Sequence, residues 1–107
     1  MLTVSLFASL LLAAQPAAAD ERARLAACLD AFVAAQQRER PAAEPFANAL
    51  ASACALEEHA YRQGHVARAV AAGTAWLAAD DMAYRDALDL RIRARTAYLT
   101  ARQACRR

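Results

Sequence analysis

Three cysteines, Cys28, Cys54 and Cys105, are the residues of this chain best equipped for chemistry. In an oxidising compartment, cysteines pair as disulfides by default. Cys28 lies twelve residues before Arg40, and Cys54 lies ten after Glu44. Two antiparallel helices joined by a short turn would therefore place Cys28 and Cys54 within about 3 Å of the same height. The spacing predicts a Cys28–Cys54 disulfide.

Cys105 is the odd cysteine, and three fates stay open for it. It competes for Cys54 if the second half of the chain forms a single hairpin, because Asp80 lies near the midpoint between them. It is otherwise a free thiol near the terminus, or it links two copies of the chain in a homodimer. A free Cys105 could also exchange with the Cys28–Cys54 bridge, which would make the protein a thiol-redox-responsive module.

Acids and histidines occur together at Glu57, Glu58, His59 and His65. Metal ligands on one helix are normally three or four residues apart, whereas His59 and His65 are six apart. We therefore interpret this segment as a solvated polar face and predict no metal and no other cofactor. Ser52 has no plausible His/Asp relay and the chain has no glycine-rich phosphate loop, so we expect no catalytic residue and no enzyme.

Every basic residue is an arginine, and the net charge is +2. So small an excess does not suggest a nucleic-acid partner. Arg91, Arg95 and Arg102 lie late in the last predicted helix and are candidates for binding an anionic ligand or envelope surface. The simpler alternative is that acids at the start of that helix and bases at its end complement the helix dipole.

The first nineteen residues, Met1–Ala19, carry no charged side chain and predict a cleaved signal peptide. A short apolar run is followed by Pro16 and then by the small residues Ala17–Ala19, which is the pattern that signal peptidase requires. The run is too short to span a bilayer stably. We expect cleavage after Ala19, a periplasmic or secreted protein, and no transmembrane segment in the mature chain.

The remaining part, residues 20–107, predicts one small all-α domain: an antiparallel, disulfide-stapled bundle of three or four helices. Alanine, leucine, arginine and glutamate dominate, and the whole chain has only two glycines and three prolines. Large apolar side chains are few, so we expect thin, closely packed helices rather than a deep core.

The apolar spacing predicts helices over residues 20–40, 44–64 and 66–79, and a last helix from Asp80, which suits an N-cap. The predicted end at Gln63–Gly64 follows from the apolar stripes before and after it, which point to nearly opposite sides. The alternative is one long helix that runs through Gly64 and packs different neighbours on its two halves.

Each predicted helix has an apolar stripe that we expect to be buried. In the first it includes Leu25, Leu29 and Val33, in the second Phe46, Leu50 and Tyr61, in the third Val66, Val70 and Leu77, and in the last Tyr84, Leu88, Ile92 and Leu99. Trp76 and the three tyrosines, Tyr61, Tyr84 and Tyr98, are expected to fill the bundle rather than to bind a ligand.

Tyr61, Gly64, Ala69 and Leu77 fall near positions used by tetratricopeptide repeats, so residues 61–80 resemble half of one such repeat. A single repeat builds no solenoid. The small residues Ala17–Ala19 with Cys28 and Cys54 make the chain similar to small secreted α-helical proteins of Gram-negative bacteria, which carry a signal peptide and a helix-to-helix cysteine pair. This resemblance implies a secreted helical protein, and many proteins of this kind have no assigned function.

The sequence thus favours a non-enzymatic structural or interaction protein of the cell envelope. Two alternatives stay open: a small binding protein for an anionic ligand or surface, and a thiol-redox-responsive module. Each of the first two roles implies a protein, ligand or envelope partner.

Overall fold

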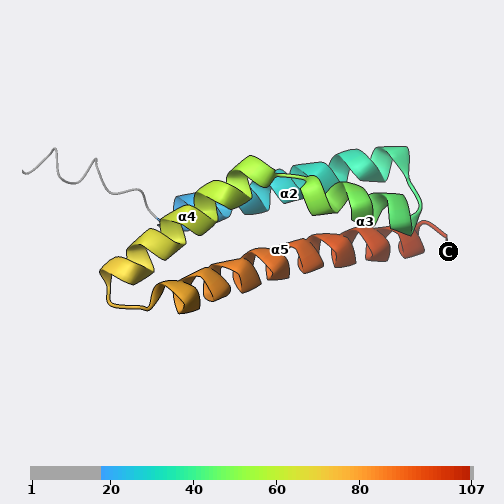
Figure 1. The fold of residues 1–107 in the computed structure, drawn as a ribbon. Coiled ribbons are helices and arrows are strands. Elements are labelled where there is room, and N and C mark those ends of the chain that lie inside the picture. The colour runs from blue at the N-terminus through green and yellow to red at the C-terminus, as the bar shows by residue number, and fades with distance from the viewer. Residues whose placement is uncertain (1–17, 107) are drawn as a thin grey trace, which may run out of the picture.

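The computed structural model of the chain describes residues 18–106, which form the all-α, disulfide-stapled bundle that the sequence predicts (Figure 1). The described part contains four helices: α2 (Ala18–Glu39), α3 (Ala43–Ser52), α4 (Ala55–Ala71) and α5 (Trp76–Ala104). Of the predicted signal peptide, Ala18 and Ala19 belong to the first turn of α2, and the rest lies outside the described residues.

α5 runs along the whole described bundle, and α3 and α4 follow each other along it (Figure 1). α2 ends at Glu39, and Arg40 takes a left-handed φ of 53° before Pro41. Because a residue before proline is disfavoured in a right-handed helix, the chain turns here and returns as α3.

The Cys28–Cys54 disulfide is present, with the two Cα atoms 6.0 Å apart. Cys54 lies between α3 and α4 with a left-handed φ of 62°. The predicted helix over residues 44–64 is therefore wrong as one element, because the chain bends at Ala53–Cys54. No glycine or proline marks this bend in the sequence, and the bridge to α2 holds it in place.

The predicted helix end at Gly64 is also wrong, because α4 continues from Ala55 to Ala71. The alternative of a helix that runs through Gly64 is the correct one. The two apolar stripes around Gly64 pointed to opposite sides, but the second stripe is not buried: Val70 and Leu77 are both exposed. The helix thus has no need to break in order to bury them.

Gly73, not Gly64, ends the helix. Its φ is 104°, a region that glycine occupies without steric cost. The N–H of Thr74 donates to the carbonyl of Ala69, and the N–H of Gly73 donates to that of Val70. These two bonds define a Schellman motif. α5 then begins at Trp76, so Asp80 lies in its second turn and is not an N-cap.

The core lies between the helices and combines large side chains from α2, α3 and α4 with four alanines and two large side chains from α5. Its buried members are Leu25, Leu29 and Val33 of α2, Phe46 and Leu50 of α3, Tyr61 of α4, and Ala79, Ala83, Ala87, Leu90, Ala94 and Tyr98 of α5.

The rings of Phe46 and Tyr98 stack with centroids 3.8 Å apart. Because alanine lets helix backbones approach closely, the α5 face that packs on α2 and α4 is made largely of alanine.

The predicted core stripe of α5 is wrong for three of its four members. Tyr84, Leu88 and Ile92 are exposed, and Leu99 is half-buried. The larger side chains were expected to face the core, but they would hold the helices too far apart for the alanine contacts. Of the aromatic residues, Tyr61 and Tyr98 fill the bundle as predicted, whereas Tyr84 and Trp76 are exposed.

Candidate functional site

An exposed apolar face is the most conspicuous surface feature of α5. Leu77 is 77% exposed, Tyr84 50%, Leu88 42% and Ile92 54%. Together with half-buried Leu99 they lie on one side of the helix, because their separations of four and seven residues correspond to whole turns. We call these five residues the α5 stripe. Several large apolar side chains exposed on one helix face make it a candidate interaction surface.

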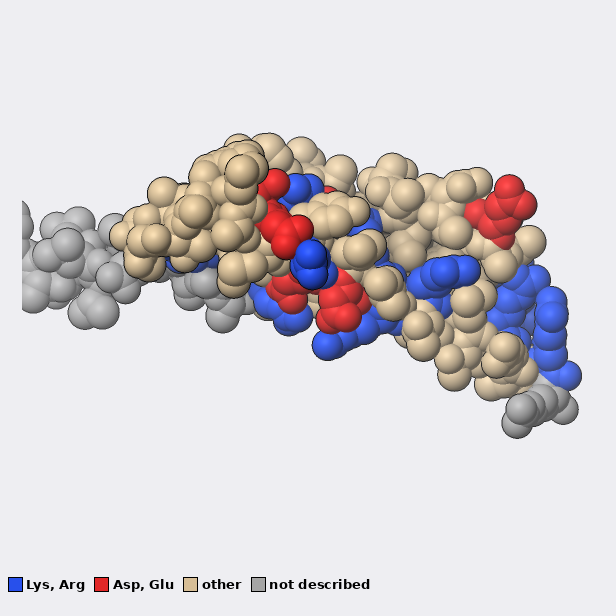
Figure 2. Space-filling view, turned by 60° about the horizontal axis from the view of Figure 1, so that its bottom comes forward, with Lys and Arg blue, Asp and Glu red and all other residues tan. Residues whose placement is uncertain are grey.

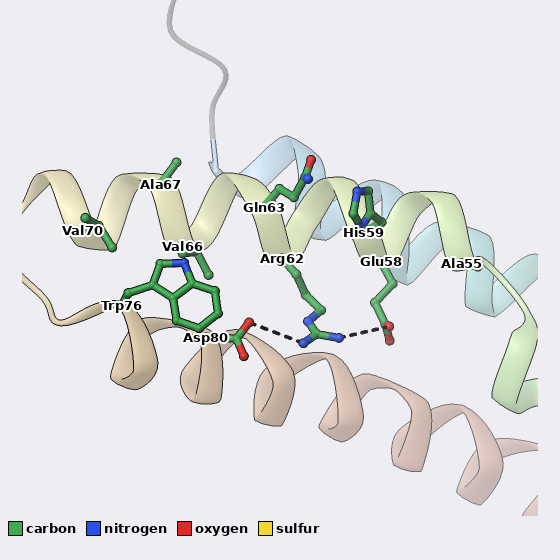
Figure 3. Close-up of a pocket in the computed structure, with 10 residues that line it drawn as sticks. All are labelled: Ala55, Glu58, His59, Arg62, Gln63, Val66, Ala67, Val70, Trp76 and Asp80. Carbon is green, nitrogen blue, oxygen red and sulfur yellow. Dashed lines mark ion pairs between the residues drawn. The ribbon is translucent and has the colours of Figure 1, made fainter.

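A groove of about 780 Å³ lies beside the start of the stripe, between α4 and α5 (Figure 3). The indole of Trp76 rises from α5 toward Val66 of α4, and Val70 lies on the same wall (Figure 3). Trp76 is 58% exposed, so this end of the groove offers an open aromatic surface. The other end is polar and contains Arg62.

Arg62 joins the two helices at the polar end of this groove. Its guanidinium lies 3.5 Å from the Asp80 carboxylate and 3.9 Å from that of Glu58 (Figure 3). The guanidinium also lies 5.4 Å from the centroid of the Tyr84 ring. Glu58 also pairs with Arg91 at 2.8 Å. Charges of alternating sign therefore join α4 to α5 along one edge of the α5 stripe.

A partly buried ion cluster around Asp86 fixes α5 from the opposite side. Its carboxylate accepts hydrogen bonds from Arg22 of α2, at 3.1 Å, and from the hydroxyl of Tyr61 of α4. Burial raises the pKa of Asp86, but these donors outweigh that effect, so its pKa lies below the ordinary value. Burial and the bond to Asp86 raise the pKa of Tyr61 to about 12.

His65 lies next to this cluster, with its ring 6.0 Å from that of Tyr61. Its Nε2 atom is buried and has no hydrogen-bond partner within the described part of the chain. Glu21 and Arg68 form a further α2–α4 ion pair nearby, at 3.0 Å. The cluster thus consists of groups that position the three long helices.

The three arginines predicted to bind an anion do not act as one open site. Arg91 donates to the carbonyl of Leu50 at the end of α3 and pairs with Glu58, and its side chain is only 13% exposed. Arg102 donates to the carbonyl of Pro41 at 2.9 Å. Arg95 is exposed and belongs to none of the ion pairs among residues 18–106. Arg91 and Arg102 therefore fasten α3 and its preceding turn to α5.

A basic cleft of about 420 Å³ lies where α5 meets the α2–α3 turn. Arg40, Arg102 and Arg106 line it together with the free, exposed thiol of Cys105. Arginine side chains gather toward this end of the molecule (Figure 2). Arg40 was not among the predicted anion-binding residues, although antiparallel packing brings the end of the first helix beside the end of the last.

The structure does not bring Cys105 to the disulfide. Cys105 lines the cleft with Gln37, which lies nine residues beyond Cys28, or about 14 Å along the helix axis. Exchange between this thiol and the bridge would require the bundle to open.

The predicted polar segment lies on α4. His59 is exposed and lines the groove, whereas His65 is half-buried beside Tyr61. Glu57 lies near the disulfide, and its carboxylate is within 4.8 Å of both sulfur atoms. Because these sulfurs are bonded to each other, they are not available to bind a metal ion as thiolates. Ser52 donates to the carbonyl of Ala49 in its own helix.

Among residues 18–106, no helix has the length and apolar character needed to cross a membrane. Comparison with known proteins found no matching family model, no matching curated protein and no matching solved structure. What this surface does must therefore follow from its own geometry.

Proposed function

We propose that this protein is a non-enzymatic interaction protein of the cell envelope, which binds another polypeptide through the α5 stripe. The observation that carries this proposal is the inversion of α5. Four of its alanines, Ala79, Ala83, Ala87 and Ala94, are buried, while Leu77, Tyr84, Leu88 and Ile92 face outward. Exposing large apolar side chains costs free energy in water, and a polypeptide that covers them recovers it.

The Cys28–Cys54 disulfide supports an extracytoplasmic location, because such bonds persist in oxidising compartments. The predicted signal peptide supports the same location. Export is tested by fractionating cells and measuring the intact mass, and we expect a periplasmic chain that begins at Asp20. A chain that retains Met1 in the cytoplasm would contradict the envelope role.

Binding through the stripe is tested with a photoreactive amino acid at Leu88 in the exported protein. We expect irradiation to join this position to a polypeptide, and the mass of the adduct identifies whether that polypeptide is a second copy or another protein. The matched control places the same amino acid at Ala31, which is exposed on α2. Adducts of equal yield from both positions, or none from either, would overturn the proposal.

The basic cleft favours a second candidate function, the binding of a small anion. Arg40, Arg102 and Arg106 converge on one hollow, and arginine is well suited to phosphate groups. Titration calorimetry with pyrophosphate tests it. We expect salt-sensitive binding that Arg106→Ala weakens and that Arg24→Ala, a change of an exposed arginine on α2, leaves intact. Binding that does not respond to Arg106→Ala would refute the cleft as the site.

A further inference from the structure

The α5 stripe has a symmetric order about Leu88. Leu77 and Leu99 are each eleven residues from it, and Tyr84 and Ile92 are each four residues from it. A symmetric order of this kind is what a self-complementary, two-fold interface requires, because each residue must face its counterpart in the second copy.

The charges within the same face follow this symmetry with opposite signs. Asp81 lies seven residues before Leu88, and Arg95 lies seven residues after it. With these two included, the separations along the face are four, three, four, four, three and four residues, which read the same in both directions. All seven residues therefore share one side of α5.

We propose that the α5 stripe is the interface of an antiparallel homodimer whose two-fold axis passes beside Leu88. This inference rests on the proposed function and names a second copy of this chain as the partner. In this arrangement Leu88 meets Leu88, Tyr84 meets Ile92, and Leu77 meets Leu99. Asp81 of each copy faces Arg95 of the other, so no like charges are opposed along the seam.

Asp81 and Arg95 are both available for this contact. Asp81 pairs with Arg85 in its own helix at 2.9 Å, but both side chains are more than half exposed, and such pairs contribute little. Arg95 has no ion pair within residues 18–106. The stripe from Leu77 to Leu99 is about 33 Å long, which gives a helix pair six turns of contact.

This dimer is different from one linked through Cys105. Each Cys105 lies seventeen residues from Leu88, so an antiparallel pair would hold the two thiols about 50 Å apart along the axis. All tests are therefore made in a Cys105→Ala background, which removes thiol-linked dimers and leaves the Cys28–Cys54 bridge undisturbed.

Charge reversal tests the antiparallel register. Sedimentation equilibrium is measured for Asp81→Arg, Arg95→Asp and the variant that combines them. Each single reversal opposes like charges twice in the dimer, so we expect the dissociation constant to rise about tenfold or more. The combined variant restores both contacts with the signs exchanged, and its dissociation constant should return to within about threefold of the parent.

The control reversal is Arg24→Asp on α2, which should leave the dissociation constant unchanged. Losses that add in the combined variant instead of cancelling would overturn the register. A parent protein that remains monomeric throughout the concentration series would overturn the dimer itself.

Cysteine cross-linking locates the two-fold axis. Leu88→Cys should form a disulfide-linked dimer on mild oxidation, because a residue at the axis meets its own copy. Tyr84→Cys alone and Ile92→Cys alone should not, whereas a mixture of these two variants should cross-link to each other. Efficient self-linking of Tyr84→Cys would mean a parallel or shifted pairing and would overturn this arrangement.

Failure of the dimer and failure of the proposed function give different results. If the chain is monomeric but the photoreactive residue at Leu88 captures another protein, the self-association is wrong and the interaction role stands. If the chain is monomeric and that residue captures nothing, both are wrong.

Discussion

Asp86 accepts hydrogen bonds from two helices while belonging to a third. Arg22 reaches it from α2 and the Tyr61 hydroxyl reaches it from α4. At the scale of single residues, this carboxylate therefore links the three long helices, α2, α4 and α5, through an ion pair and a hydrogen bond. Its pKa is lower, and that of Tyr61 higher, than in an unfolded chain, so the two groups couple folding to pH at opposite ends of the scale.

Asp86→Asn removes the negative charge and keeps the shape of the side chain. We expect the free energy of unfolding to fall by about 1–2 kcal/mol at neutral pH, a modest value because Asp86 and Arg22 are partly exposed. A carboxyl with a lowered pKa stabilises the folded state above its unfolded pKa and loses that effect as the pH falls through its folded pKa.

The difference between Asp86→Asn and the parent should therefore shrink under acid conditions. Urea unfolding at a series of pH values measures it. A difference that stays constant down to the most acid condition would contradict the role of the Asp86 charge.

Tyr61→Phe tests the other end of the scale. The parent Tyr61 hydroxyl has its pKa raised from 10.0 to about 12, so its contribution is complete below pH 10 and is lost as the pH rises toward 12. We expect Tyr61→Phe to lose about 1 kcal/mol at neutral pH and to show a weaker decline in stability above pH 10. Tyr84→Phe, at an exposed ring, should behave as the parent does; a similar change in both variants would refute the assignment.

At the scale of elements, the two glycines of the chain have different roles: Gly64 lies within α4, and Gly73 lies just after its end. Gly73 ends the helix with a positive φ of 104°. Gly64 lies inside the helix, where an added Cβ would overlap the carboxylate of Glu21 from α2. Gly73 is needed for its backbone conformation, and Gly64 is needed for the close approach of the Glu21 side chain.

Gly73→Ala should lower the free energy of unfolding by about 1–2 kcal/mol, because a side chain opposes the left-handed backbone. Gly64→Ala should gain less than the roughly 1 kcal/mol that alanine contributes inside a helix, because it displaces Glu21 from its ion pair with Arg68. Thermal unfolding of both variants, and of Gly64→Ala combined with Glu21→Ala, measures this. Compared with Glu21→Ala alone, the combined variant should show the full gain of about 1 kcal/mol that alanine contributes inside a helix. If Gly64→Ala gives the same gain with and without the Glu21 side chain, Glu21 moves away freely.

Composition and spacing predicted the helical class, the buried apolar residues of α2 and the Cys28–Cys54 disulfide. The first two depend on local propensity and periodicity, and the disulfide depends on the number of residues on either side of one turn. They did not predict which face of α5 is buried. Alanine and leucine are both apolar, and only the distance between helices decides between them. Close packing on α2 and α4 selects Ala83 and Ala87 for the core and leaves Leu88 outside.

The bends and the basic cleft were missed for a similar reason. The left-handed residue Cys54 has no local signal in the sequence, because its conformation is imposed by the turn and the bridge to Cys28. The cleft depends on Arg40 and Arg106, which meet only once α2 and α5 lie side by side. Candidate residues that are assembled by packing do not follow from spacing along one helix.

At the scale of the whole molecule, α5 packs against the other helices on one side only (Figure 1). The core side is thin, because alanine supplies four of the six buried apolar positions of α5. A single small domain of this kind has marginal stability from its core alone. Stability must therefore depend on the disulfide, and an uncovered stripe leaves further apolar area for association.

The disulfide is tested by removing each sulfur in turn. The bridge closes a loop with a sequence separation of 26, for which the loop-entropy estimate is about 3–4 kcal/mol. Cys28→Ala and Cys54→Ala should each lower the free energy of unfolding by a similar amount, and the double variant by little more, because either change opens the same loop.

Cys105→Ala should leave the stability of the monomer nearly unchanged, since this thiol is exposed and unpaired in the described part. Urea unfolding below the concentration at which copies associate measures all four variants. Losses that add in the double variant would mean that each sulfur stabilises the fold through its own packing and not through the bond between them.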